Sequence, residues 1–232
     1  MNYLTLTAAA VFFLLHLVSE TIASFIKYNF SSLGRHMLGI SLSNIFAIAS
    51  RGFVALYGIS IAVVIEKSFA DIQIYGYVFS FVLILGAGFS LLLANLKLSK
   101  AAFEDLIQGK LPLHQRFRTA FSANDTTCLI PVRGVAALML GTQFIAVVIA
   151  YGLCFYLPQN RLLIISFVPL VSMMGTLVTI LWVEPRLASM IDADNVTGYS
   201  AAREFLRARA LSFSFCAALL LMMPWLMSGS GS

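Results

Sequence analysis

Arg51 constrains this sequence most, because it lies in the middle of an otherwise apolar stretch from Met37 to Ile65. A guanidinium does not lose its proton, and a charge held at the centre of a bilayer costs about 3 kcal/mol on insertion scales and more in simulations. A chain keeps such a residue where it faces a polar cavity, a counter-ion or a ligand head group. The sequence therefore predicts a functional site inside a membrane protein.

The composition is that of an integral membrane protein. Hydrophobic residues make up 60% of the 232 residues and charged residues 11%, whereas a soluble domain carries roughly 25% charged residues. We expect an all-α, polytopic fold with six spans of about 20 residues, the length that crosses the hydrocarbon of a bilayer. The spans are predicted near Leu4–Phe25, Leu38–Ile65, Ile72–Leu96, Val135–Leu157, Leu162–Val183 and Ala210–Met227.

The predicted elements form one domain. Residues 1–227 are expected to be a single transmembrane domain, and residues 228–232 have the Ser-Gly repeat of an engineered linker. The second span is roughly 42 Å long as a straight helix, so it must tilt, project from the membrane or break, and Arg51-Gly52 is the expected break. The connection from Lys97 to Arg133 has the pattern of two short helices lying on the membrane surface. Ser200 is expected to cap the last helix.

The basic residues predict the orientation of the chain. Twelve of the 15 Lys and Arg residues fall on connections one, three and five, two fall on the opposite side, and Arg51 lies within a span. The positive-inside rule then places these three connections in the cytoplasm and both termini outside. The net charge of +5 therefore indicates contact with anionic lipid rather than with nucleic acid.

The first span has a polar face of its own. His16 and Glu20 stand four residues apart and Lys27 follows seven further on, so the three share one side of a helix. Counting from Lys27 places Glu20 roughly 10 Å and His16 roughly 17 Å inward. Two interpretations stay open for Glu20, a functional carboxylate or a partly immersed one beside a snorkelling Lys27. His16 fits a structural histidine as well as a proton carrier.

The Arg51 face of the second span is otherwise lined by small side chains, at Asn44, Ala47, Ala55, Gly58 and Ala62. Small residues let another helix approach closely, and they equally leave room for a ligand. Arg51 lies roughly 20 Å from the inner surface and Asn44 roughly 10 Å, so His16 is level with Arg51 and Glu20 with Asn44. We predict one polar seam between the first two spans. A structural Arg51–Glu20 pair is the alternative to a ligand site.

The sequence lacks the motifs that are typical of several kinds of chemistry. The chain has no P-loop, no zinc-protease motif and no nucleophile elbow. The three cysteines have neither metal nor disulfide spacing, and Asp192 and Asp194 are two alternate carboxylates in a connection. We therefore expect no metal, no cofactor and no ATP-driven transport by this chain alone.

A collinear series of motifs resembles one known family. The series comprises His16-x-x-x-Glu20-Thr21, Ser41-Leu42-Ser43-Asn44 through Ser50-Arg51, Glu184-Pro185-Arg186-Leu187, and Asp192 through Gly198-x-Ser200. Together these motifs resemble the Amj family of bacterial lipid II flippases, the alternate to MurJ, over nearly the whole chain. The resemblance implies a transporter of the cytoplasmic membrane rather than an enzyme. Its cargo would be the undecaprenyl-pyrophosphate-linked peptidoglycan precursor, moved to the outer leaflet for cell-wall synthesis and cell shape.

The hypothesis assigns a role to each candidate residue. Basic residues at the inner rim collect the head group, Arg51 holds the pyrophosphate near the midplane, and Asn44 with the nearby serines contacts the sugars. Glu20 neutralises Arg51 when no lipid is bound, and His16 couples this exchange to protons. The expected substrate-binding residues are Arg51, Asn44, Glu20, His16, Ser43, Ser50, Arg35, Lys27, Arg133 and Glu184.

Two other classes stay open. One is a membrane-embedded enzyme acting on polyprenyl phosphates with Glu20 and His16 as acid and base, and the other is a non-catalytic membrane assembly protein whose polar seam only packs helices. The expected partners are lipid II, other membrane lipids and a second copy of the chain. A dimer is favoured because six helices enclose little volume for a disaccharide-pentapeptide.

Overall fold

The described part of the chain is helical, as the sequence predicts. The computed structural model describes residues 2–32, 36–67, 72–96, 147–155, 157–178, 181, 185 and 198–228. Its helices are α1 (Asn2–Ser32), α2 (His36–Glu66), α3 (Ile72–Ala94), the short 3-10 helix η2 (Pro158–Asn160), α7 (Arg161–Val178) and α9 (Gly198–Ser228). Residues 147–155 are also helical.

Four described helices are long and apolar enough to cross a membrane. Their candidate spans are Tyr3–Phe30, Met37–Glu66, Gln73–Ala94 and Ser200–Met223. They correspond to the first, second, third and sixth predicted spans. Residues 147–155 and α7 fall within the predicted fourth and fifth spans, whereas the predicted surface helices between Lys97 and Arg133 lie outside the described residues.

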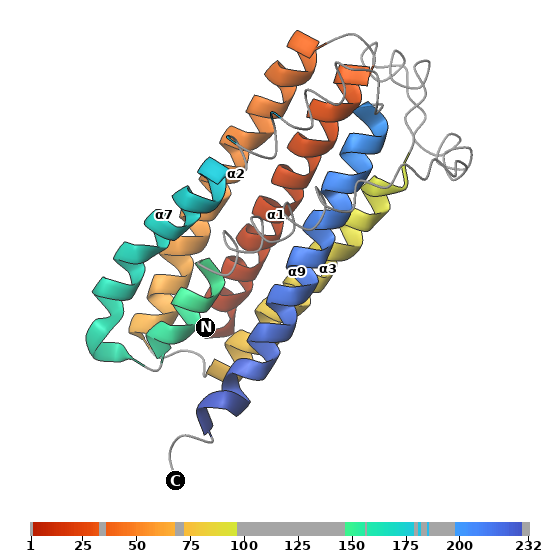
Figure 1. Cartoon of the computed structure of the whole chain (residues 1–232). Helices are drawn as coiled ribbons and strands as arrows, with labels where there is room; N and C mark the ends of the chain where they lie inside the picture. Colours follow the sequence, from red (N-terminus) through yellow and green to blue (C-terminus); the bar gives the residue numbers. More distant parts are fainter. Residues whose placement is uncertain are drawn as a thin grey trace.

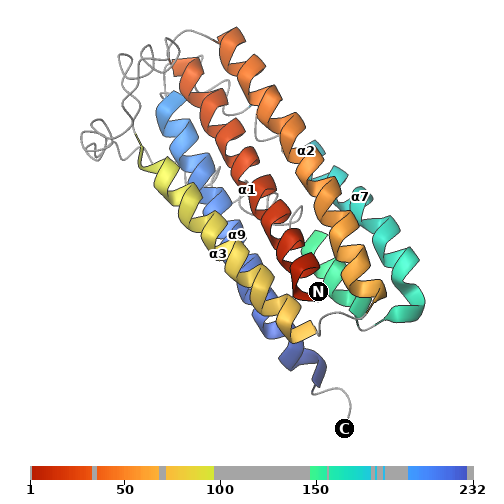
Figure 2. The same cartoon turned by 180° about the vertical axis from the view of Figure 1, so that it is seen from behind.

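α1 lies in the middle of the bundle. It packs along α2 on one side and against α3 and α9 on the other, and α3 packs along α9. Figure 1 shows this order, and the view from behind in Figure 2 shows the same arrangement with α7 on the α2 side. The start of α1 and the end of α9 lie at the same end of the bundle (Figures 1 and 2), which is the arrangement expected for an even number of crossings.

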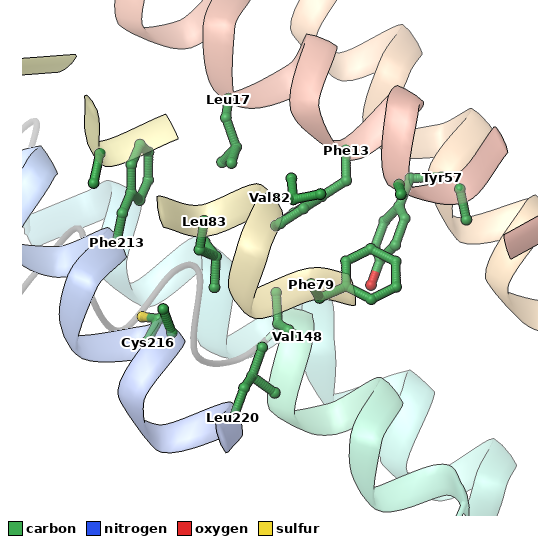
Figure 3. Packing of buried hydrophobic residues seen from close by; sticks show 14 of the residues in the cluster. Phe13, Leu17, Tyr57, Phe79, Val82, Leu83, Val148, Phe213, Cys216 and Leu220 are labelled. Atoms are coloured by element: carbon green, nitrogen blue, oxygen red, sulfur yellow. The ribbon is translucent and has the colours of Figure 1, made fainter. Parts of the chain in front are cut away.

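An aromatic cluster holds the end of the bundle where α1 begins. Phe13 of α1 lies 4.9 Å from the ring centroid of Tyr57 in α2 and 5.7 Å from that of Phe79 in α3. All three side chains are fully buried, and Figure 3 shows them meeting between the helices. Tyr75 extends the cluster, with its ring 4.6 Å from that of Phe79 and 5.3 Å from that of Phe155. These contacts connect three spans and residues 147–155.

Small residues permit the closest helix contacts, as the sequence suggests for the third span. A Cβ added to Gly86 of α3 would lie 3.0 Å from Leu17 and 3.2 Å from Phe213. Where α1 and α2 meet, a Cβ on Gly39 would lie only 2.4 Å from the Cβ of Phe30. The absence of a side chain at Gly39 is therefore a condition for the α1–α2 contact.

Two sequence expectations about the helices are wrong. α2 continues as one α-helix through Arg51 and Gly52, because a single glycine weakens a helix by only about 1 kcal/mol. α9 begins at Gly198, two residues before the predicted cap, and it includes Arg203, Arg207 and Arg209, which the sequence places in a connection. Ser200 therefore lies inside α9 instead of capping it.

Candidate functional site

α2 presents two different faces to its surroundings. The face toward α1 carries the buried residues Ser43, Ser50, Tyr57, Ile61 and Val64. The face turned away from α1 is exposed at Ser41, Asn44, Ile48, Arg51, Gly52 and Ala55. The predicted single polar seam between the first two spans is therefore not formed. Ser43 and Ser50 face α1, whereas Asn44 and Arg51 lie on the exposed side of α2.

Arg51 is exposed at the midpoint of the α2 span. It lies 14 residues after Met37 and 15 before Glu66, so roughly 20 Å of helix extends on either side. Among the described residues, Arg51 has no hydrogen bond, and no ion pair connects it to Glu20. The alternative of a structural Arg51–Glu20 pair is therefore wrong for this structure.

His16 connects α1 to the buried face of α2. Its Nδ1 lies 2.7 Å from the hydroxyl of Ser50 and 3.3 Å from the Ser50 carbonyl oxygen. The predicted register, which makes His16 level with residues 50 and 51 of the second span, is confirmed by these contacts. The His16 ring also lies 6.0 Å from that of Phe13, so it adjoins the aromatic cluster.

Glu20 pairs with Arg209, a residue that the sequence places outside the membrane. The Nη2 of Arg209 donates to Oε2 of Glu20 over 3.1 Å, and the Arg209 side chain is 5% exposed whereas that of Glu20 is 32% exposed. Phe205 lies one turn earlier in α9, with its ring centroid 5.8 Å from Cζ of Arg209. The pair ties α1 to α9 within the candidate spans of both helices.

The Arg209 guanidinium is only partly satisfied by Glu20. Its Nε and Nη1 are buried and have no hydrogen-bond partner among the described residues. A buried donor left without an acceptor costs about 1–3 kcal/mol, and more when the group is charged. The two unpaired nitrogens therefore make Arg209 a candidate for the functional site.

Two tyrosine hydroxyls form a second buried polar contact. The hydroxyls of Tyr57 and Tyr75 lie 3.2 Å apart, and Tyr75 donates to the carbonyl oxygen of Val148 over 2.8 Å. The ring of Tyr151 lies 5.4 Å from that of Tyr57. These bonds anchor residues 147–155 to α2 and α3, and they serve packing.

The remaining candidates fall into two groups. Lys27 is half-buried near the end of α1, and Ser43 donates to the carbonyl oxygen of Ile40 over 2.9 Å, within its own helix. Arg35, Arg133 and Glu184 lie outside the described residues. Within the described ranges, no three His, Cys, Asp or Glu side chains lie close enough to hold a metal ion.

Arg209 was not among the predicted site residues. Charged residues lower the hydropathy of a segment, so the predicted span began after Arg209. A usable signal was the run of small residues around it, since Ala201, Ala202, Ala208 and Ala210 are all buried. Small residues on one helix side indicate close packing against a neighbour, and an Arg among them has to pack with them. The chain matches no family model, no curated protein and no solved structure.

Proposed function

We propose that this protein is a lipid flippase of the bacterial cytoplasmic membrane. Its cargo is lipid II, the undecaprenyl-pyrophosphate-linked precursor of peptidoglycan, which it moves from the cytoplasmic to the outer leaflet. The observation that carries this proposal is the exposed guanidinium of Arg51 at the midpoint of a continuous apolar helix. The resemblance of the motif series to the Amj family supports the same cargo.

An exposed cation at mid-membrane suits a lipid with an anionic head group. The pyrophosphate can bind Arg51 from the side of the bundle while the polyprenyl tail stays in the surrounding lipid. A guanidinium offers two parallel donors to phosphate oxygens. The bound anion also removes the cost of an unpaired charge in the hydrocarbon, so binding stabilises both partners.

The Arg51 face has further groups for a sugar head group. Ser41 and Asn44 are exposed on this face, two to three turns from Arg51 toward the end where α2 begins. Their distance along the helix is roughly 10–15 Å, which is the scale of a disaccharide attached to the pyrophosphate. Lys27 lies near the same end of the bundle, on α1, where it can attract the anionic head group.

The membrane potential is a sufficient source of energy for this transport. The cell interior is negative, so an anionic head group moves outward with the field. Each charge gains about 2.3 kcal/mol per 100 mV. No nucleotide site is required for this mechanism.

Arg51→Ala tests the proposal in cells that depend on this protein for lipid II transport. We expect at least a tenfold loss of lipid II accessible at the outer leaflet, with partial activity in Arg51→Lys. Ile48→Ala is the matched control, because Ile48 is exposed on the same face one turn away. Normal transport by Arg51→Ala at wild-type protein level would exclude Arg51 from the mechanism and reject the proposal.

Two experiments distinguish a flippase from the two other functional classes. An enzyme acting on polyprenyl phosphates would release phosphate from a lipid pyrophosphate, and we expect none. An assembly protein would keep its activity in the double variant Arg51→Leu with Glu20→Gln, and we expect that variant to lose transport. Mass measurement in nanodiscs determines whether the chain forms a dimer.

A further inference from the structure

Arg209 is a second intramembrane cation, and it is buried instead of exposed. Its residue is 4% exposed and stands nine positions inside the span that begins at Ser200, which is roughly 14 Å of helix. Glu20 stands ten positions from Phe30, the end of the α1 span, at a similar depth. The pair thus lies more than two helical turns from the nearer end of each candidate span.

The contact with Glu20 satisfies only one of the three nitrogens of the Arg209 guanidinium. Only Nη2 of Arg209 donates to Glu20, over 3.1 Å, while Nε and Nη1 have no acceptor among the described residues. Nε and Nη2 form one edge of a guanidinium, the edge that binds two oxygens of a phosphate side by side. Glu20 therefore occupies half of a site that a phosphate would fill.

The electrostatic surroundings of the pair are simple. His16 and Glu20 of α1 and Arg209 of α9 are within electrostatic range of one another, and Tyr28 is close to Arg209. α3 has no charged residue, and residues 41–50 of α2 contain no titratable side chain. On α9, Arg203, Glu204 and Arg207 stand one to two turns nearer the helix start. Lys27 stands seven residues from Glu20 on the same side of α1. Among the described residues, Glu20 is the acid that pairs with Arg209.

We propose that Arg209 and Glu20 form a proton-linked binding site for a phosphate group of a membrane lipid. The phosphate takes the Nε–Nη2 edge of Arg209, and the displaced Glu20 carboxylate takes up one proton. The proton taken up by Glu20 offsets one of the negative charges that the phosphate group brings to the neutral pair. Glu20 is the route of approach, since its side chain is 32% exposed whereas that of Arg209 is 5% exposed.

This inference deepens the proposed lipid transport and rests on it for its biological meaning, but its binding test is independent of Arg51. A proton taken up with the anion makes binding tighter at low pH. His16, one turn from Glu20 and in electrostatic contact with it, is a described group able to exchange that proton.

Binding of farnesyl pyrophosphate to the full chain in phosphatidylcholine nanodiscs tests the site between pH 5.5 and 8.5. The affinity of the wild type is divided at each pH by that of Glu20→Gln, which cancels the titration of the probe itself. We expect this ratio to fall about tenfold per pH unit once Glu20 ionises. Arg209→Gln should lose at least tenfold in affinity at every pH, while Glu66→Gln, at the end of α2, should match the wild type.

Each outcome of the binding experiment either supports or overturns the proposed site. A ratio that stays constant with pH overturns the proton linkage, and Arg209→Gln binding at wild-type affinity overturns the site. Because Arg209→Gln also removes a buried contact, Glu20→Gln, which keeps the shape of the side chain, provides an independent measure. Competition by inorganic pyrophosphate supports a site for free anions, whereas preference for the farnesyl compound supports a lipid. Loss of transport by Arg51→Ala with the pH-dependent ratio intact distinguishes this site from the Arg51 site.

Discussion

The Nη2 atom of Arg209 donates a hydrogen bond of 3.1 Å to Oε2 of Glu20, which stands 189 positions earlier in the chain. The bond joins the first described helix to the last. It gives Glu20 a partner other than Arg51 and leaves Arg51 exposed on α2. The two arginines therefore differ in their surroundings: Arg209 is a buried cation with two nitrogens unpaired among the described residues, and Arg51 is a cation exposed on the outer face of α2.

Removing one member of this pair should destabilise the protein. Glu20→Ala leaves the buried guanidinium of Arg209 without a counter-ion, and we expect a loss of about 2 kcal/mol, below the 3–5 kcal/mol of a fully buried pair because Glu20 is partly exposed. Thermal unfolding in detergent measures the effect. Glu66→Ala, at an exposed glutamate of α2, is the control and should leave the midpoint unchanged. Equal midpoints for the two variants would contradict the importance of the pair.

The hydroxyl of Ser50 should stabilise the α1–α2 contact. Ser50→Ala removes the partner 2.7 Å from His16 Nδ1 and leaves the weaker contact to the Ser50 carbonyl oxygen. We expect a loss of about 1 kcal/mol, the usual net value of one hydrogen bond. Ser41→Ala changes an exposed serine of the same helix and should be neutral. An effect of Ser41→Ala as large as that of Ser50→Ala would contradict this account.

Glycines in α2 and α3 should differ sharply in their tolerance of alanine. Gly39→Ala places a methyl group 2.4 Å from the Cβ of Phe30, and neither atom can move without moving a backbone. We expect a loss of 1–3 kcal/mol, about that of an overpacked core. Gly88→Ala meets nothing within 4 Å and should be neutral or slightly stabilising, since alanine favours a helix. Both variants are compared by their unfolding midpoints.

Tyr75→Phe should loosen residues 147–155. The substitution keeps the ring and removes the hydroxyl that donates to Val148 over 2.8 Å and contacts Tyr57. We expect a loss of about 1–2 kcal/mol, because the Val148 carbonyl loses its donor inside the core. Tyr77→Phe removes a hydroxyl from a tyrosine that is 60% exposed and serves as the control. Faster proteolysis near residues 147–155 in Tyr75→Phe alone would confirm the anchoring role.

Both ends of the chain should lie on the same side of the membrane. α1 begins and α9 ends at one end of the bundle (Figure 1), and the distribution of basic residues predicts that this end is outside. Reporter fusions at the two termini, each active only on one side of the membrane, test this prediction. Opposite results at the two termini would require an odd number of crossings, and two cytoplasmic termini would reverse the predicted orientation.

The membrane spans could be predicted from the sequence because hydropathy is a local property. A run of apolar residues in a helix is sufficient to indicate a span, so α1, α2 and α3 lie where their composition predicts. The level of His16 against Ser50 also follows from local information, since a short connection between two helices sets their register. The position of Arg51 at the midpoint of the α2 span required nothing beyond its place in the apolar run.

The partner of each polar side chain was decided by the tertiary structure. Hydropathy assigned Arg209 to a connection, because it counts the charge and not the carboxylate that compensates it from another helix. The rotation of α2 likewise depended on which face packs against α1. The face with Ser43, Ser50 and Tyr57 buries uncharged groups at little cost, whereas burying Arg51 there would require a second counter-ion. Glu20 is held by Arg209, so Arg51 turns outward.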